Sequence, residues 1–277
     1  MPSNLRTTAA TDTVIYAARR ILTMNPARPE ATHVAVREGR ILGAGTLEEL
    51  AGWGPHRLDD RFAGQVLMPG LVEGHSHLMA GTLWRFAYCG FFDVRDPQGR
   101  LVPGAKSLDD VVAALARAAA ATPGDTPVVG WGFDPIYFHG GDGGGRRCTR
   151  ADLDRVSATR PVGLLHASAH ILNVNTAALR AAGFLREGIV HPAFPLGADG
   201  LPTGELKGPE AMLPVVGVVG LKREFLSGDE AGMRDFARLA VRAGVTTATD
   251  LAATLNDPEV ETLARVTAEP DYPLRLV

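Results

Sequence analysis

The tetrapeptide Gly74-His75-Ser76-His77 holds the side chains of this chain best suited to chemistry, because its two histidines stand two positions apart. Residues two apart on a β-strand point to the same face, so both imidazoles can reach one divalent cation. Neutral imidazole is a good ligand for zinc, iron or nickel. The spacing alone is a weak signal, since two hydrogen-bonded surface histidines give the same pattern. The metal interpretation of His75 and His77 therefore depends on the chain around them.

That chain contains three segments that could position such a site. Val66 to Val72 is an apolar run, and we expect a buried strand there that delivers the histidines at its carboxyl end. Val245 to Thr249 is β-branched and ends next to Asp250, and Leu274 to Val277 enters another strand. A helix is expected to begin at Ser227-Gly-Asp-Glu230, before the second of these segments, and another at Asn256-Asp-Pro-Glu259, between the last two. Strand, helix and strand of these lengths indicate parallel β/α units.

The first part of the chain has a different pattern, with short apolar strands separated by turns. The expected strands are Thr13 to Tyr16, Arg20 to Thr23, His33 to Val36 and Gly39 to Gly45. Residues 1–66 are therefore predicted to form a small β-sandwich portion.

The middle of the chain mixes helix and strand signals. Ser107 is placed to cap an alanine-rich helix that ends before Pro123, and a short helix from Asn175 is expected to stop at Gly183. Strand-like runs at Thr126 to Gly130 and Pro161 to Leu165 lie between them. We expect an α/β insertion at about residues 85–226.

Composition excludes several classes of function. The 277 residues carry 28 basic and 31 acidic side chains and a net charge of −3, without the concentrated basic face that nucleic acid requires. Two isolated cysteines predict no disulfide framework. The polar N-terminus does not resemble a signal peptide, and no apolar run reaches the roughly 18 residues of a membrane span. We expect a cytoplasmic protein with no nucleic-acid or membrane partner.

Several motifs together resemble the amidohydrolase superfamily. Met68-Pro-Gly-Leu-Val-Glu-Gly-His-Ser-His77 is similar to its "PGxVDxHxH" signature, in which the first barrel strand presents a metal-binding histidine pair. Within the superfamily the chain is most similar to amidohydrolase family 3. The motifs that carry this likeness are Gly130-Trp-Gly-Phe-Asp134, His166-Ala-Ser-Ala-His-Ile-Leu-Asn-Val-Asn175, Pro202-Thr-Gly-Glu-Leu-Lys207 and Gly244-Val-Thr-Thr247.

The resemblance implies an α/β fold, a partial metal-dependent hydrolase (β/α)8 TIM-type barrel with the small N-terminal β-sandwich and the α/β insertion. Residues 67–277 would supply an incomplete barrel with strands one to three. It also implies one or two divalent metal ions, with zinc as the first candidate, held in part by His75 and His77. The remaining ligands and the general acid/base Asp of such enzymes come from later strands, and we expect that Asp beyond Val277. We therefore expect a truncated chain that is inactive alone or needs a complementing segment.

Four further residues are candidates for substrate binding. His170 matches a histidine in a "SGHxxxxN" segment of family 3, with Ala169 in place of the usual glycine, and His166 could share its site. Asp134 could orient a polar group of the substrate, although capping the turn before Pro135 explains it equally well. Asp250 follows an expected barrel strand, on the face where such barrels carry out chemistry.

These observations predict a metal-dependent amidohydrolase that hydrolyses a non-peptide C–N bond in a small amide, N-formyl or N-acyl compound by a metal-activated water. A deaminase or cyclic-amide hydrolase of the same superfamily is the first alternative. An inactive remnant or binding module is the second. The expected partners are a small-molecule substrate and either a second copy of the chain or a complementing C-terminal segment.

Overall fold

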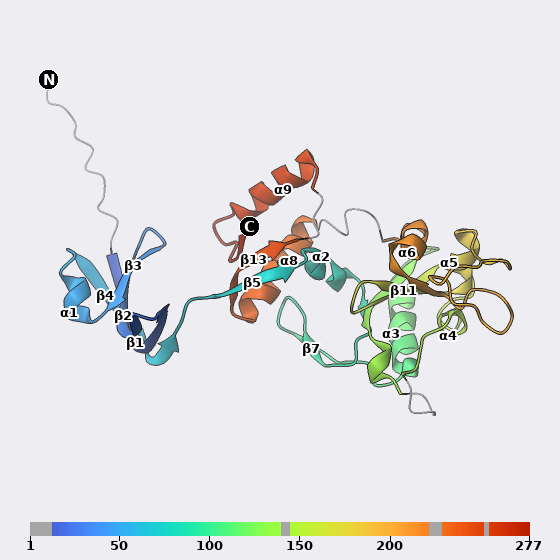
Figure 1. The fold of residues 1–277 in the computed structure, drawn as a ribbon, viewed down its shortest axis with the longest axis horizontal. Helices are drawn as coiled ribbons and strands as arrows, with labels where there is room; N and C mark the ends of the chain where they lie inside the picture. The colour runs from blue at the N-terminus through green and yellow to red at the C-terminus, as the bar shows by residue number, and fades with distance from the viewer. Residues whose placement is uncertain (1–12, 140–144, 222–228, 252–254) are drawn as a thin grey trace, which may run out of the picture. The chain divides into compact units, whose positions relative to one another are not determined.

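The computed structural model describes residues 13–139, 145–221, 229–251 and 255–277 (Figure 1). The chain divides into two compact units, residues 1–71 and 72–277. Among the described residues, no helix is long and apolar enough to cross a membrane.

The first unit is one four-stranded sheet with a short helix. Its strands are β1 (Thr13–Asn25), β2 (Arg28–Arg37), β3 (Arg40–Gly45) and β4 (His56–Leu67), in the order β3-β2-β1-β4, and its helix is α1 (Leu47–Ala51). Ile15, Ala35 and Leu50 are buried between sheet and helix. The strands predicted at Thr13 to Tyr16 and Arg20 to Thr23 are one strand, because no Gly or Pro separates them and the pairing only shifts register. The predicted sandwich is not confirmed, since these strands form a single sheet.

The second unit contains a five-stranded mixed sheet, which we call the insertion sheet. It consists of β6 (Ala87–Tyr88), β9 (Val128–Phe133), β10 (Val162–His166), β11 (Ile171–Val174) and β12 (Glu205–Lys207), in the order β12-β11-β10-β9-β6. β6, β9 and β10 run parallel, whereas β11 and β12 are antiparallel to their neighbours.

Helices cover this sheet and bury both of its faces (Figure 1). Val128 in β9 packs into one apolar cluster with Val111 and Leu115 of α3, while the next residue, Val129, packs into a second cluster with Val215 of α6. This alternation is the period of two that a strand buried on both sides requires. The helices are α3 (Leu108–Ala121), α4 (Arg150–Asp154), α5 (Thr176–Ala181) and α6 (Gly208–Val216).

Local capping signals fix the helix ends as the sequence predicts. The Ser107 hydroxyl accepts the N–H of Asp110 at the start of α3, and the Asp110 carboxylate accepts the N–H of Ser107. Asn175 caps α5 in the same position, and Gly183 follows that helix in a left-handed conformation. Both predicted helices are confirmed.

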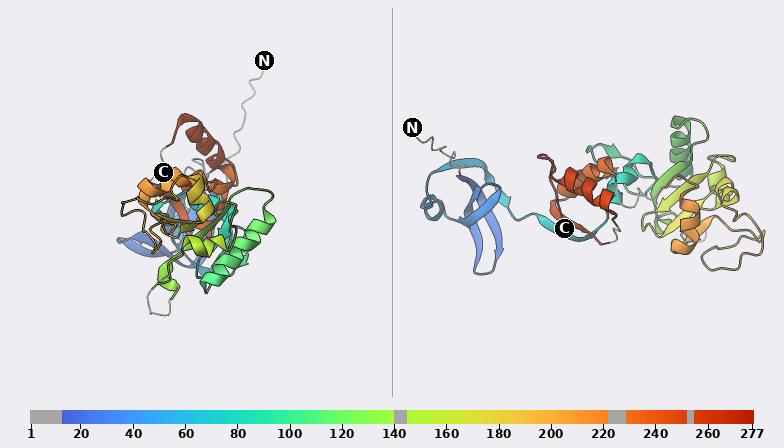
Figure 2. Two further views of the ribbon diagram at one scale, coloured as in Figure 1. Left: turned by 90° about the vertical axis from the view of Figure 1, so that its right-hand side faces the viewer. Right: turned by 90° about the horizontal axis from the view of Figure 1, so that it is seen from above.

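A three-stranded sheet, which we call the histidine sheet, carries the histidine pair. Its strands β5 (Leu71–Ser76), β13 (Val245–Asp250) and β14 (Arg275–Leu276) lie in the order β14-β13-β5, and β13 and β14 are parallel. Helices α8 (Glu230–Arg242) and α9 (Asp257–Thr267), orange to red in Figure 2, pack next to this sheet. Along the chain β5 is followed by α2 (Met79–Thr82), η1 (Leu83–Arg85) and a hairpin of β7 (Val94–Arg95) and β8 (Leu101–Val102), and η2 (Pro135–Tyr137) follows β9. Over the described residues this sheet is open, so the fold is α/β but the closed barrel is not confirmed.

The strand before the histidines differs from the prediction. The apolar run from Val66 to Val72 is divided between two strands, because β4 ends at Leu67 and β5 begins at Leu71. Pro69 lies between them and has no N–H to donate to a ladder. β5 is also exposed rather than buried, with Val72 71% accessible. The expectation of a buried strand was therefore wrong for the described structure.

Candidate functional site

His75 and His77 present their imidazole rings side by side at the end of β5. The ring centres lie 5.1 Å apart and the ring planes are almost perpendicular, at 88°. Both side chains are accessible, since His75 is exposed and the side chain of His77 keeps 40% of its surface. A cation and a water molecule can therefore reach both rings.

The ring spacing fits a shared divalent cation. Two imidazoles bound through nitrogens at about 2.0–2.1 Å to a tetrahedral zinc would have ring centres roughly 5 Å apart. An edge-to-face aromatic pair has the same spacing, so this distance does not distinguish the two cases. Across the described residues, no cluster of three or more His, Cys, Asp or Glu side chains could hold a metal ion. The pair thus fits as part of a coordination shell.

Asp250, the last residue of β13, connects this strand to the histidine pair. Its Oδ1 atom lies 3.1 Å from Nδ1 of His77, and its Oδ2 atom accepts the backbone N–H of Leu78 at 2.8 Å. Only 9% of the Asp250 side chain is exposed. Asp250 was predicted to line the site as a substrate-binding residue, and the structure places it against a histidine of the pair. Sequence reasoning missed this contact because the two residues are 173 positions apart.

The structure places His166 inside the insertion sheet. It is 6% exposed at the end of β10, and its Nε2–H donates to Oδ1 of Asn173 at 2.5 Å. Asn173 donates in turn to the carbonyl of Cys148. Burial lowers the pKa of His166, and the hydrogen bond with Asn173 opposes that effect only in part. This neutral, bonded histidine has the surroundings of a core residue.

His170 and Asp134 have local partners. Nδ1 of His170 contacts the carbonyl of Ser168, and the ring is exposed. Asp134 accepts the N–H of Ile136 and caps η2, which is the turn-capping role considered for it. Ala169 has a φ of 58°, so the loop keeps the left-handed conformation that a glycine would adopt freely. Substrate binding by these residues stays a prediction.

A buried carboxylate of the insertion sheet was not among the predicted site residues. Glu205 is 3% exposed, and its carboxylate pairs with Arg147 at 2.6 Å and with Lys207 at 3.3 Å. The motif that contains Glu205 and Lys207 was recognised, but Arg147 comes from 58 positions away. Two cations therefore compensate this buried charge, as a buried charge in a folded protein requires.

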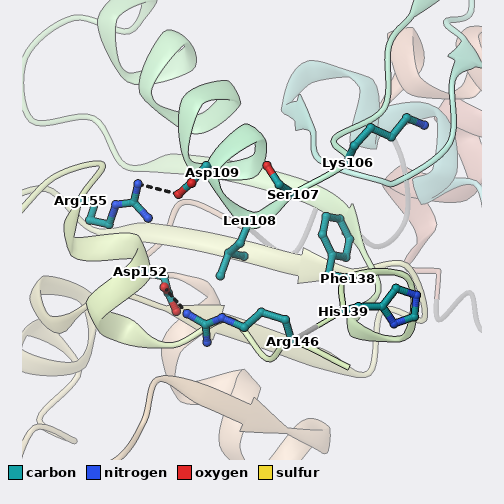
Figure 3. A pocket seen from close by; sticks show the side chains of 9 residues that line it. All are labelled: Lys106, Ser107, Leu108, Asp109, Phe138, His139, Arg146, Asp152 and Arg155. Atoms are coloured by element: carbon teal, nitrogen blue, oxygen red, sulfur yellow. Dashed lines mark hydrogen bonds and ion pairs between the residues drawn. The ribbon is translucent and has the colours of Figure 1, made fainter. Parts of the chain in front are cut away.

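The hollow drawn in Figure 3 lies elsewhere, at the start of α3, and has a volume of about 350 Å³. Four of its charged side chains are paired with each other, Arg155 with Asp109 at 2.8 Å and Arg146 with Asp152 at 2.9 Å. None of the predicted site residues is among its described lining, which is Lys106, Ser107, Leu108, Asp109, Phe138, His139, Arg146, Asp152 and Arg155. It is a feature of the insertion rather than of the histidine site.

Comparisons with known proteins agree with the motifs. A family model for the amidohydrolase family matches residues 63–277. Protein LONG AFTER FAR-RED 3 of Arabidopsis thaliana is 27% identical over 238 residues, which are 83% of this chain and 37% of that protein. The putative amidohydrolase YtcJ of Bacillus subtilis is 30% identical over 162 residues, 57% of this chain and 27% of that protein. The chain thus spans between about a quarter and two fifths of these relatives.

A solved structure shares the fold. The uncharacterized metal-dependent hydrolase from Pyrococcus horikoshii superposes with a TM-score of 0.59 at 16% sequence identity. The alignment covers 96% of this chain and 48% of that one. The described elements therefore occur together in a protein about twice as long.

Proposed function

Because this chain belongs to the amidohydrolase family, we propose that it is part of a metal-dependent hydrolase that cleaves a C–N bond other than a peptide bond. The proposed substrate is a small amide, N-formyl or N-acyl compound. The observation that carries the proposal is the pair of accessible imidazoles of His75 and His77, 5.1 Å apart at a strand end. The description of the Pyrococcus protein as a metal-dependent hydrolase supports the metal-dependent hydrolysis in this proposal.

In this proposal His75 and His77 hold a divalent cation, with zinc as the first candidate. When bound, such a cation lowers the pKa of a water molecule and polarises the carbonyl of the substrate. The protein's own contribution is to hold both rings at one point that solvent can reach. Ser76, between the two histidines, donates from its hydroxyl to the carbonyl of Thr249 at 2.6 Å and so fixes the end of β5 to β13.

The rest of the coordination shell is proposed to come from residues outside those described here. Two imidazoles bind a cation more weakly than a complete set of three or four ligands. The relatives are longer than this chain, and the further ligands and a general acid/base carboxylate are proposed to lie in a segment that corresponds to their additional length. A complementing segment or a second copy of the chain is the proposed partner.

A deaminase or cyclic-amide hydrolase would use the same histidine pair on a ring carbon. An inactive remnant or binding module is the alternative from another class. Hydrolysis assays on linear and cyclic amides, with a complementing segment supplied, separate the three.

Metal content tests the proposal most simply. The purified chain and the double variant His75→Ala/His77→Ala are each incubated with zinc, and unbound zinc is removed. The zinc content of both proteins is then measured by elemental analysis. We expect bound zinc in the original chain and its loss in the variant. A matched double variant of two exposed histidines, His56→Ala/His191→Ala, should keep the metal. Equal metal content in all three proteins would remove the assignment.

A further inference from the structure

We propose that Asp250 is the positioning residue of the histidine site, which holds His77 in the tautomer that has its proton on Nδ1 and leaves Nε2 to bind the cation. This inference rests on the proposed function for the identity of the ligand, but the tautomer itself can be measured without any metal. It assigns Asp250 a role toward the histidine pair instead of the substrate.

The chemistry of the carboxylate fixes the direction of the contact. An ionised Asp only accepts hydrogen bonds, so the 3.1 Å contact between Oδ1 of Asp250 and Nδ1 of His77 requires the hydrogen on Nδ1. In a neutral imidazole the other nitrogen then carries the lone pair. Metal-binding histidines commonly donate their second ring N–H to a carboxylate in this way, which sets the ring orientation and raises its basicity.

The second oxygen of Asp250 prevents the carboxylate from turning away. Oδ2 accepts the backbone N–H of Leu78 at 2.8 Å, and Leu78 is 2% exposed in an apolar cluster with Ala248 of β13. On the other side of His77, the hydroxyl of Ser76 is bonded to the carbonyl of Thr249. The residues before and after His77 are therefore both hydrogen-bonded to β13, and the His77 ring between them is in contact with Asp250 of the same strand.

This contact also distinguishes the two explanations of the ring spacing. An edge-to-face aromatic pair needs no carboxylate behind either ring. A ligand needs its lone pair directed outward, and a carboxylate with 9% of its side chain exposed behind a ring with 40% exposed provides that. The geometry favours a ligand prepared before the metal binds.

The first arm of the test is made on the metal-free chain, at a pH where histidine is neutral. Long-range proton–nitrogen NMR on histidine-labelled protein reports which ring nitrogen of His77 carries the hydrogen. We expect Nδ1–H in the original chain, and loss of that preference in Asp250→Ala. The Nε2–H tautomer in the original chain would overturn the proposal, and this result does not require any variant to fold.

The second arm measures zinc affinity by calorimetric titration. Asp250→Ala is expected to weaken binding by about 10- to 100-fold, the range found when a carboxylate behind a metal ligand is removed. Asp250→Asn retains one acceptor oxygen, so its zinc affinity should lie between those of Asp250→Ala and the original chain. Ser76→Ala removes the neighbouring tie between β5 and β13 but keeps the carboxylate, so its tautomer should be unchanged and its affinity altered less than about 3-fold.

The outcomes separate this proposal from the proposed function. An Nδ1–H tautomer that depends on Asp250, in a chain that binds no zinc, would refute the metal site and with it the role of Nε2. Zinc binding that depends on His75 and His77, with equal affinity in Asp250→Ala and the original chain, would keep the proposed function and refute the positioning role.

Discussion

The insertion sheet and the histidine sheet show opposite relations between burial and chemistry. Every residue of β10 in the insertion sheet is buried, and apolar side chains alternate between its two covered faces. In β5 of the histidine sheet, five of six residues are exposed. The first sheet is held by its own core, whereas His77 is held by hydrogen bonds from β13. Stability and the proposed chemistry therefore depend on different residues, which substitutions can test.

Truncation of the insertion core should have the largest effect on stability. Leu164 in β10 is fully buried, so Leu164→Ala is expected to lower the free energy of unfolding by about 2–5 kcal/mol through lost burial and a cavity. Val72→Ala in the exposed β5 should change it by less than about 0.5 kcal/mol. Urea denaturation of both variants measures the difference. Equal losses would show that the histidine sheet is as well packed as the insertion.

A close helix contact next to the histidine pair provides the second test. A Cβ atom at Gly81 in α2 would lie 1.9 Å from the carbonyl oxygen of Gly232 in α8. Gly81→Ala should therefore destabilise the chain by about 1–3 kcal/mol and weaken zinc binding, because α2 begins at Met79, two residues after His77.

The matched control for that contact is Gly217→Ala, at a glycine with helical backbone and no neighbour within 4 Å of an added Cβ. It should be neutral or stabilising by up to about 1 kcal/mol. Thermal unfolding and zinc titration are compared for both variants. If Gly81→Ala folds and its zinc affinity is unchanged, α2 does not help to position the histidine pair.

The buried histidine of the insertion should give a dependence on pH. Burial lowers the pKa of His166 in the folded chain below its ordinary value of 6.5, so the unfolded chain binds the proton more readily. The contribution of neutral His166 to the free energy of unfolding is complete when the pH is above 6.5, and it is lost as the pH falls below that value. In His166→Gln, the glutamine can still donate to Asn173 but cannot bind the proton. The urea concentration at the midpoint of unfolding should therefore fall less between neutral and acidic pH than it does in the original chain. Parallel pH profiles would contradict this account of His166.

The smallest effect concerns the loop after β10. Ala169 has a left-handed backbone with φ of 58°, so Ala169→Gly should stabilise the chain by about 0.5–1 kcal/mol. The same replacement at the exposed Ala116 in α3 should destabilise it by about 1 kcal/mol. Opposite signs in urea denaturation would support the backbone argument, and a loss at Ala169 would contradict it.

Local signals explain what could be predicted from the sequence. The caps at Ser107 and Asn256 and the β-branched run of β13 depend only on neighbouring residues, so the helices α3 and α9 and the strand were predicted closely. The histidine pair was found because its spacing of two belongs to one strand end. These features need no knowledge of the tertiary fold.

Features that depend on distant residues were not predicted. Asp250 was recognised as a site residue, but its contact with His77 joins strands 173 positions apart and has no local pattern. The bond from His166 to Asn173 crosses the β10 and β11 hairpin, and pairing these two strands from the sequence could have revealed it. One local signal was also missed: the apolar run at Val66 to Val72 predicts a single strand, but Pro69 within it divides the run between β4 and β5.

The central claim is that His75 and His77 bind one divalent cation together. X-ray absorption at the zinc edge of the loaded chain measures the ligands directly. We predict two imidazole ligands with nitrogen atoms at about 2.0–2.1 Å from the zinc, and loss of both imidazole signals in His75→Ala/His77→Ala. A zinc environment without imidazole, or one that is the same in the double variant, would contradict the claim.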